Sequence, residues 1–147
     1  MLVKDWMTPE PQTVSLDTTY FEAYKLLKLG GFRRLPVLSL GHLIGIVTDR
    51  NIKEATPSNA TALSADELNG LLKPLQMKNI MTKPVITVNP EDDIETAALI
   101  LDEHKISGLP VVQNGKVVGI ITTTDILRAF VSILNLRDGK KLNPRAA

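Results

Sequence analysis

Residues 35–48 read LPVLSLGHLIGIVT, and residues 109–122 read LPVVQNGKVVGIIT, so one phrase is written twice in this 147-residue chain. The two phrases align without insertion or deletion. Extending the alignment places residues 3–55 on residues 77–129, with sixteen of fifty-three positions identical. Internal similarity at a fixed offset indicates a repeated structural unit. The sequence therefore predicts two like modules in tandem.

Each copy shows the same predicted order of elements. β-branched residues at 13–14 and 85–88 predict a strand, and each repeated phrase predicts two strands joined by a tight turn, at 40–41 or 114–115. Asn114 and Gly115 are typical of a type I′ turn, which needs positive φ at both central residues, and Leu40 and Gly41 hold the same place in the first copy. Between them, apolar residues at helical spacing predict a half-buried helix; these are Tyr20, Ala23, Tyr24 and Leu27, matched by Ile94, Ala97, Ala98 and Leu101. A second helix follows Thr48 or Thr122. The predicted class is α+β, with two βαββα repeats that bury apolar faces against each other in pseudo-twofold symmetry.

The chain divides into residues 1–55 as the first repeat, 56–76 as a connector, 77–136 as the second repeat and 137–147 as a polar tail. In the connector, Ser64 and Glu67 have capping-box spacing and predict the start of a short helix. A packed linker helix is favoured over contact with a partner domain. Candidate N-caps for the first helix of each repeat are Ser15 or Asp17, and Asn89 or Asp92.

Composition excludes several classes of function. The chain has no cysteine and two distant histidines, so we expect no thiolate chemistry and no metal site. Its net charge of +1 gives no general attraction to nucleic acid. It lacks an apolar run of the ~20 residues that span a membrane, and its first residues lack the apolar core of a signal peptide. We therefore expect a cytoplasmic protein without catalytic residues; an enzyme or a nucleic-acid binder is the third and weakest alternative.

Thr122 and Asp125 lie where an apolar strand meets a helix, as do Thr48 and Asn51 in the first copy. One interpretation is a capping box that satisfies free N–H groups of the helix. The other is a ligand contact, because a carboxylate can accept hydrogen bonds from both hydroxyls of a ribose. The two interpretations are compatible for Thr122.

Three features together carry a resemblance to a known family. LPVL with GIVTDRNI, LPVV with GIITTTDI, and KDWMTP and KNIMTK at the heads of the copies closely resemble tandem cystathionine β-synthase (CBS) domains. The resemblance implies a pseudo-twofold pair, or Bateman module, whose two clefts hold AMP, ADP, ATP or S-adenosylmethionine. It also implies homodimers packed into a disc. Residues 58–82 resemble the connector of acetoin-utilisation-type CBS proteins, although these often continue into an ACT domain and we expect none here.

The resemblance also implies two sets of ligand-binding residues. In the second site it places Ile86, Thr87, Leu109 and Pro110 around adenine and Thr122 and Asp125 on ribose. In a weaker first site the equivalent residues are Gln12, Thr13, Leu35, Pro36, Thr48 and Asn51. Asn51 replaces the usual Asp, and an amide lacks the charge that strengthens a hydrogen bond to ribose.

Arg33 and Arg34 occupy positions where relatives carry basic residues for phosphate, and a guanidinium can contact phosphate through two hydrogen bonds. The alternative is that both are solvated surface charges. Their counterparts, Ser107 and Gly108, carry no charge. The two sites are therefore expected to be unequal.

The predicted function is a nonenzymatic regulatory module, typical of energy sensing. An adenosine-containing ligand would alter the dimer or an unknown regulated partner, with no required cofactor. The alternative is a structural dimerisation or scaffolding module whose clefts stay empty.

Overall fold

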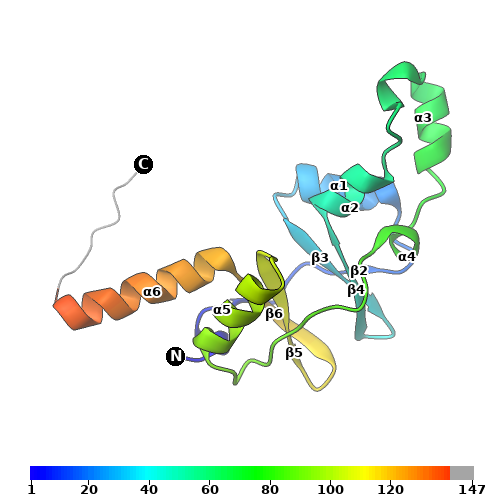
Figure 1. Cartoon of the computed structure of the whole chain (residues 1–147). Coiled ribbons are helices and arrows are strands. Elements are labelled where there is room, and N and C mark those ends of the chain that lie inside the picture. Colours follow the sequence, from blue (N-terminus) through cyan, green and yellow to red (C-terminus); the bar gives the residue numbers. More distant parts are fainter. Residues whose placement is uncertain (140–147) are drawn as a thin grey trace. The chain divides into compact units, whose positions relative to one another are not determined.

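The computed structural model describes residues 1–139. Over these residues the chain forms six α-helices, two short 3-10 helices (Val3–Asp5 and Ala60–Ala62) and two three-stranded sheets (Figure 1). It divides into two compact units, which we describe separately. The first unit consists of residues 10–86 with 113–117, and the second unit, within the described residues, of residues 1–9, 87–112 and 118–139. The predicted α+β class is confirmed.

The first unit is built on the sheet β2-β3-β4. Strand β2 (Val14–Ser15) runs parallel to β3 (Arg34–Ser39), which is antiparallel to β4 (His42–Thr48). Helices α1 (Tyr20–Lys28) and α2 (Asp49–Ala55) cover one face of this sheet (Figure 1). Ala23 and Leu27 of α1 are buried with Leu35 and Val37 of β3 in the hydrophobic core, as the helical spacing predicted.

The second unit is built on the sheet β1-β6-β5. It contains β1 (Thr8–Pro9), β5 (Gly108–Gln113), β6 (Lys116–Thr122) and the helices α5 (Ile94–Glu103) and α6 (Thr123–Asp138). The strand predicted at 85–88 is reduced to one bridge, in which Val88 N donates to Pro110 O at 3.1 Å. The ladder stops there because the chain turns at Asn89, whose N–H is taken by Asp92 Oδ2 at 2.9 Å.

In each unit, the segment that starts one repeat packs against the strands of the other repeat. Residues 1–9 join the second unit, where Thr8 of β1 pairs with Ile120 of β6. Helix α4 (Met77–Ile80) and the residues after it join the first unit, where Thr82 bridges Ile46 of β4. The two compact units therefore do not coincide with the two sequence repeats.

Two glycines leave the space in which the first residues of each repeat pack against a strand of the other repeat. A Cβ on Gly119 would collide with the sulfur of Met7, and a Cβ on Gly45 would collide with the sulfur of Met81. Each methionine thus lies flat on a strand at a position where only glycine leaves room. The pairing of Met7 with Met81 and of Gly45 with Gly119 in the repeat is explained by this contact.

The hairpin turns have the predicted type. Asn114 and Gly115 have φ values of 52° and 78°, and Leu40 and Gly41 have φ values of 50° and 81°. Positive φ at both central residues defines a type I′ turn. Leu40 adopts this conformation although it is a branched residue without the local hydrogen-bonding ability of asparagine.

The predicted caps of the first helices were wrong by one to four residues. The N-cap of α1 is Thr19, whose Oγ1 accepts from Glu22 N at 3.2 Å, and the N-cap of α5 is Asp93. Ser15 instead bonds to Thr18, and Asn89 and Asp92 form the turn before α5. Several side chains capable of capping precede each helix, so the spacing of such residues alone does not single out the one at which the helix begins.

The connector contains the predicted helix, α3 (Ala65–Leu72), capped by Ser64 Oγ, which accepts from Glu67 N at 3.1 Å. Leu72 is buried, whereas Leu71 is exposed. At the end of the chain α6 extends through Asp138, so the first two residues of the predicted polar tail are helical. Residues 140–147 of that tail lie outside the described residues.

Candidate functional site

The predicted residues of the second repeat gather at one end of the sheet in the second unit. β6 ends at Thr122 and α6 begins with the next residue, while Leu109 and Pro110 lie at the start of the neighbouring strand β5. Thr87 directly precedes Val88, which bridges β5. Because β5 and β6 are joined by a tight turn, the start of one and the end of the other share an edge of the sheet. Ile86 belongs to the other compact unit, so the structure assigns it no place in this set.

Thr122 and Asp125 form a reciprocal capping box at the start of α6. Thr122 N donates to Asp125 Oδ2 at 2.8 Å, and Thr122 Oγ1 donates to the same oxygen at 2.9 Å. Asp125 N in turn donates to Thr122 Oγ1 at 3.4 Å. The structural interpretation of this pair is therefore confirmed.

The cap leaves one oxygen of Asp125 nearly unused. The residue is only 5% exposed, and its Oδ1 receives a single long hydrogen bond of 3.5 Å from Arg128 Nη1. The Arg128 side chain is itself 70% exposed, so that contact is weak. A carboxylate oxygen has two acceptor positions, and a buried one is strengthened as an acceptor by its low-dielectric surroundings. Asp125 therefore combines a fixed orientation with spare acceptor capacity.

The predicted residues of the first repeat gather in the same way in the first unit. Gln12 and Thr13 precede β2, and Leu35 and Pro36 lie at the start of β3 beside it. Thr48 ends β4 and is the cross-strand partner of Arg34. Leu35 and Pro36 are fully buried, as are Leu109 and Pro110 in the second unit, so these residues offer a ligand their backbone and not their side chains.

Asn51 differs from Asp125 in how its hydrogen bonds are used. Its Oδ1 accepts from Thr48 N at 2.8 Å and from Thr48 Oγ1 at 3.1 Å. Its Nδ2 donates to Ile80 O and to Thr82 Oγ1, both at 2.9 Å. An amide side chain has two donor and two acceptor positions, and all four are occupied within the protein. Asn51 thus holds Ile80 and Thr82, near the start of the second repeat, through hydrogen bonds. The sequence pattern did not reveal this role.

The two arginines differ in environment. Arg33 is exposed just before β3, whereas Arg34 is half-buried at the first position of that strand. Burial lowers the pKa of the Arg34 guanidinium from its ordinary value, and the neighbouring charge of Arg33 lowers it further. An anion bound here would offset both effects, because an opposite charge favours the charged form of a group.

Two further observations bear on the class of site. Within residues 1–139, no three His, Cys, Asp or Glu side chains are grouped so that they could hold a metal ion. In the same part of the chain, no helix combines the length and the apolar character needed to cross a bilayer.

Comparison with known proteins identifies the family. The CBS domain model matches residues 3–58 and 77–132, and the chain belongs to the CBS domain family. A CBS domain-containing protein of Dictyostelium discoideum is 31% identical over 136 residues, which cover 91% of this chain and 94% of that protein. The L-aspartate semialdehyde sulfurtransferase of Methanocaldococcus jannaschii is 32% identical over 131 residues, but these cover 88% of this chain and only 23% of the larger protein.

Three solved structures share the arrangement of a CBS domain pair. The pair of protein MJ0100, in complex with 5′-methylthioadenosine and S-adenosyl-L-methionine, has a TM-score of 0.74 at 32% identity over 90% of this chain and 98% of that one. CBSX2 in complex with AMP has a TM-score of 0.75 at 29% identity, with the same coverage. A Vibrio cholerae protein named for acetoin utilization (AcuB) has a TM-score of 0.76 at 27% identity over 97% of this chain and 98% of that one. The predicted resemblance to tandem CBS domains is confirmed, and a protein named for acetoin utilization is among the structures that this chain resembles.

Proposed function

We propose that this chain is a nonenzymatic regulatory module whose second unit binds the adenosine part of a nucleotide or of S-adenosylmethionine. The observation that carries the proposal is the buried Asp125, held by Thr122 through Oδ2 with Oδ1 nearly unused. A ribose presents two adjacent hydroxyl donors, which such an oxygen can accept. Thr87 and the backbone of Leu109 and Pro110 would border the base. The ligands of MJ0100 and CBSX2 both contain adenosine, which supports this class of ligand.

The first unit is proposed as a weaker and chemically different site. Asn51 has no hydrogen-bonding position left for ribose, so Thr48, Gln12, Thr13 and the backbone of residues 35–36 would have to hold a ligand there. The Arg33 and Arg34 pair favours a phosphate-bearing ligand, such as AMP, ADP or ATP.

The regulatory step requires two arrangements of the protein with different ligand affinity. We propose that these belong to a homodimer, or to its contact with a regulated partner, in the cytoplasm.

Calorimetric titration tests the ribose assignment. We expect Asp125→Ala to weaken binding of AMP or S-adenosylmethionine about ten- to a hundredfold, or about 1.5–3 kcal/mol, the cost of losing a charged hydrogen-bond partner. Asp125→Asn is the matched control, because the amide oxygen can still accept from Thr122 and the loss is then one of charge. Unchanged affinity in Asp125→Ala would overturn the role of Asp125.

A second titration separates ribose from phosphate recognition. Because 5′-methylthioadenosine has no phosphate, replacing Arg33 or Arg34 by Ala should weaken AMP binding and leave 5′-methylthioadenosine binding unchanged. Equal effects on both ligands would contradict a phosphate contact.

A ligand-free scaffold is the second candidate function, favoured by the internal saturation of Asn51. The two candidates differ in thermal denaturation. A ligand at 100 times its dissociation constant stabilises a binding protein by about 2.7 kcal/mol, whereas a scaffold shows no shift with AMP, ADP, ATP or S-adenosylmethionine.

A further inference from the structure

Two methionines occupy equivalent places in the two units, each with its sulfur against a glycine of a strand. Met7 lies on Gly119 of β6, and Met81 lies on Gly45 of β4. A Cβ added to either glycine would meet the Cγ of the methionine at 2.9 Å, which is closer than carbon atoms pack. Each methionine therefore contacts the backbone of its strand directly, and an atom added to the sulfur on that side has no room.

The four methionines of the chain differ in their access to solvent. Met77 is completely buried and Met1 is 43% exposed, whereas Met7 and Met81 are half-buried. Met7 and Met81 thus combine a tight contact with access to small solutes. Oxidation to methionine sulfoxide turns a flexible apolar side chain into a polar, chiral one and disrupts the packing around it. The consequence depends on what each of these two contacts holds in place.

Residues 1–9, which contain Met7, connect two parts of the second unit. Near the start of this segment, Val3 N donates to Asp92 O at 2.8 Å, just before α5. At its end, β1 pairs with β6. Met7 lies between these two attachments, so the loss of its contact with β6 would act on a segment that ties α5 to the sheet.

The corresponding segment of the first unit, which contains Met81, is held by an additional pair of hydrogen bonds. Asn51 Nδ2 donates to Ile80 O and to Thr82 Oγ1, both at 2.9 Å and on either side of the methionine. Asp125 stands at the equivalent position of the second unit, and a carboxylate has no proton to donate. The methionine contact therefore accounts for more of the attachment in the second unit than in the first.

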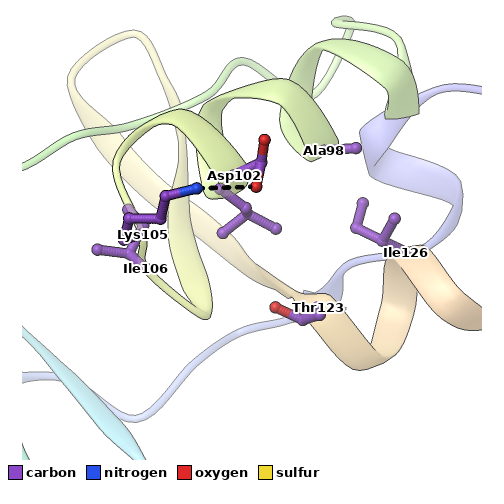
Figure 2. A pocket seen from close by; sticks show the side chains of 7 residues that line it. Ala98, Asp102, Lys105, Ile106, Thr123 and Ile126 are labelled. Atoms are coloured by element: carbon purple, nitrogen blue, oxygen red, sulfur yellow. Dashed lines mark hydrogen bonds and ion pairs between the residues drawn. The ribbon is translucent and has the colours of Figure 1, made fainter.

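The two helices of the second unit leave an open pocket between them. It has a volume of about 270 Å³ and lies between the C-terminal half of α5 and the first turn of α6, and Figure 2 shows side chains of both helices around it. Its apolar lining comes from Ala98, Leu101, Ile106 and Ile126. Direct packing of α5 on α6 is thus incomplete there, and residues 1–9 add a second connection between α5 and the strand that leads into α6.

We propose that Met7 is an oxidation site, at which a hydroperoxide forms methionine sulfoxide and the sulfoxide releases residues 1–9 from β6. The sulfur attacks one oxygen of hydrogen peroxide, so that the S–O bond forms as the O–O bond breaks. The proton of the transferred oxygen passes to the departing hydroxide, which leaves as water; sulfur loses two electrons and the peroxide gains them. A methionine sulfoxide reductase supplied with a thiol reverses the step. The site is independent of the proposed adenosine ligand, because neither Met7 nor Gly119 is assigned to that ligand.

Trp6 is the only tryptophan of the chain and directly precedes Met7, so its fluorescence reports on this segment. The full-length protein would be treated with increasing concentrations of hydrogen peroxide. We expect the emission of Trp6 to shift to longer wavelength as the ring enters water, and the unfolding temperature to fall by about 3–8 °C. Methionine sulfoxide reductase with dithiothreitol should restore both. Oxidised Met7 with unchanged emission and an unchanged unfolding temperature would overturn the proposal.

Peptide mass spectrometry identifies the methionine that reacts. Trypsin places the four methionines in separate peptides, because at least one lysine lies between each methionine and the next. We expect Met7 to gain one oxygen at peroxide concentrations that leave the buried Met77 unchanged. The oxidised fraction of Met7 should follow the change in Trp6 emission. A Met7 as well protected as Met77 would show that the contact is closed to oxidants and would overturn the proposal.

Leucine substitutions separate the effect of Met7 from that of Met81. Met7→Leu removes the sulfur at nearly the same volume, so peroxide should no longer change the emission of Trp6 or the unfolding temperature. Met81→Leu is the matched control and should respond to peroxide as the parent does. Each variant is compared with itself before and after treatment, so a lower starting stability does not affect the result. A full response in Met7→Leu would contradict the assignment.

Glutamine substitutions test the structural consequence without peroxide. Met7→Gln introduces a polar side chain of similar length and should reproduce the shift in Trp6 emission and the fall in unfolding temperature. Met81→Gln should lower the unfolding temperature less, because Asn51 still holds the residues on either side of position 81. If Met7→Gln unfolded at the same temperature as the parent, or if Met81→Gln were the less stable of the two, the proposed role of Met7 would be wrong.

Discussion

The side-chain amide of Asn51 donates a 2.9 Å hydrogen bond from Nδ2 to the main-chain carbonyl of Ile80. Through this bond the first turn of α2 holds the head of the second repeat. The equivalent residue of the second repeat is Asp125, whose carboxylate accepts hydrogen bonds and cannot donate them. The difference between NH₂ and O⁻ at one position thus separates a structural contact from an available acceptor.

This contact predicts that Asn51→Asp destabilises the protein. A carboxylate would face the Ile80 carbonyl and lose both donated bonds, at a cost of about 1–3 kcal/mol in the free energy of unfolding. Urea denaturation at pH 7 measures the change. Asp125→Asn is the reciprocal control and should cost less, since its amide oxygen still accepts from Thr122; an Asn51→Asp protein as stable as the parent would show that the contact is dispensable.

The contact between Gly119 and Met7 predicts a steric effect. In Gly119→Ala the new Cβ would meet Met7 Cγ at 2.9 Å and Thr8 O at 3.0 Å, so both the side chain and the backbone of the head must shift. Overpacking of this kind costs about 1–3 kcal/mol of unfolding free energy. Gly70→Ala is the matched control, because no atom lies within 4 Å of its added Cβ, and it should stabilise α3 slightly. Equal unfolding midpoints for the two variants would contradict the steric account.

The turn at Leu40 predicts a stabilising substitution. This residue is 99% exposed and has a φ of 50°, so its side chain gains nothing from packing while its backbone is strained. Leu40→Asn should raise the free energy of unfolding by about 0.5–1 kcal/mol. Asn114→Leu at the equivalent turn should lower it by a similar amount, and chemical denaturation of both variants would show whether the two effects have opposite signs.

The ion pairs of Asp49 predict a dependence on pH. Hydrogen bonds from Lys28 and Lys53 lower the pKa of the Asp49 carboxyl in the folded protein. A lowered folded-state pKa adds stability above about pH 4 that disappears as the pH falls through the folded-state value. Asp49→Asn should therefore be slightly less stable than the parent at pH 7, and the difference should vanish toward pH 3. Urea denaturation across this range measures it; high salt should shrink the difference at pH 7, and a difference that grows with acidification would contradict the assignment.

Much of the fold could be predicted because its signals are local. The spacing of Ala23 and Leu27 indicated the buried side of α1, and Asn114–Gly115 indicated a type I′ turn. The capping relation between Thr122 and Asp125 was equally visible, since both partners lie within one turn of helix. The strand predicted at 85–88 failed because a strand needs a partner along its whole length, and only Val88 has one.

The sequence by itself determined the repeat, the order of its elements and the difference between Asn51 and Asp125. Each of these can be recognised from short runs of consecutive residues within a copy. The tertiary structure alone decided which head joins which repeat, that Asn51 is saturated by Ile80 and Thr82, and that Asp125 keeps an oxygen nearly unused. The first two of these properties depend on contacts between segments about thirty or more residues apart, such as Asn51 with Thr82 and Met7 with Gly119. A hydrogen-bonding group shows in sequence that it can bond, but only its folded surroundings show whether that capacity is already used.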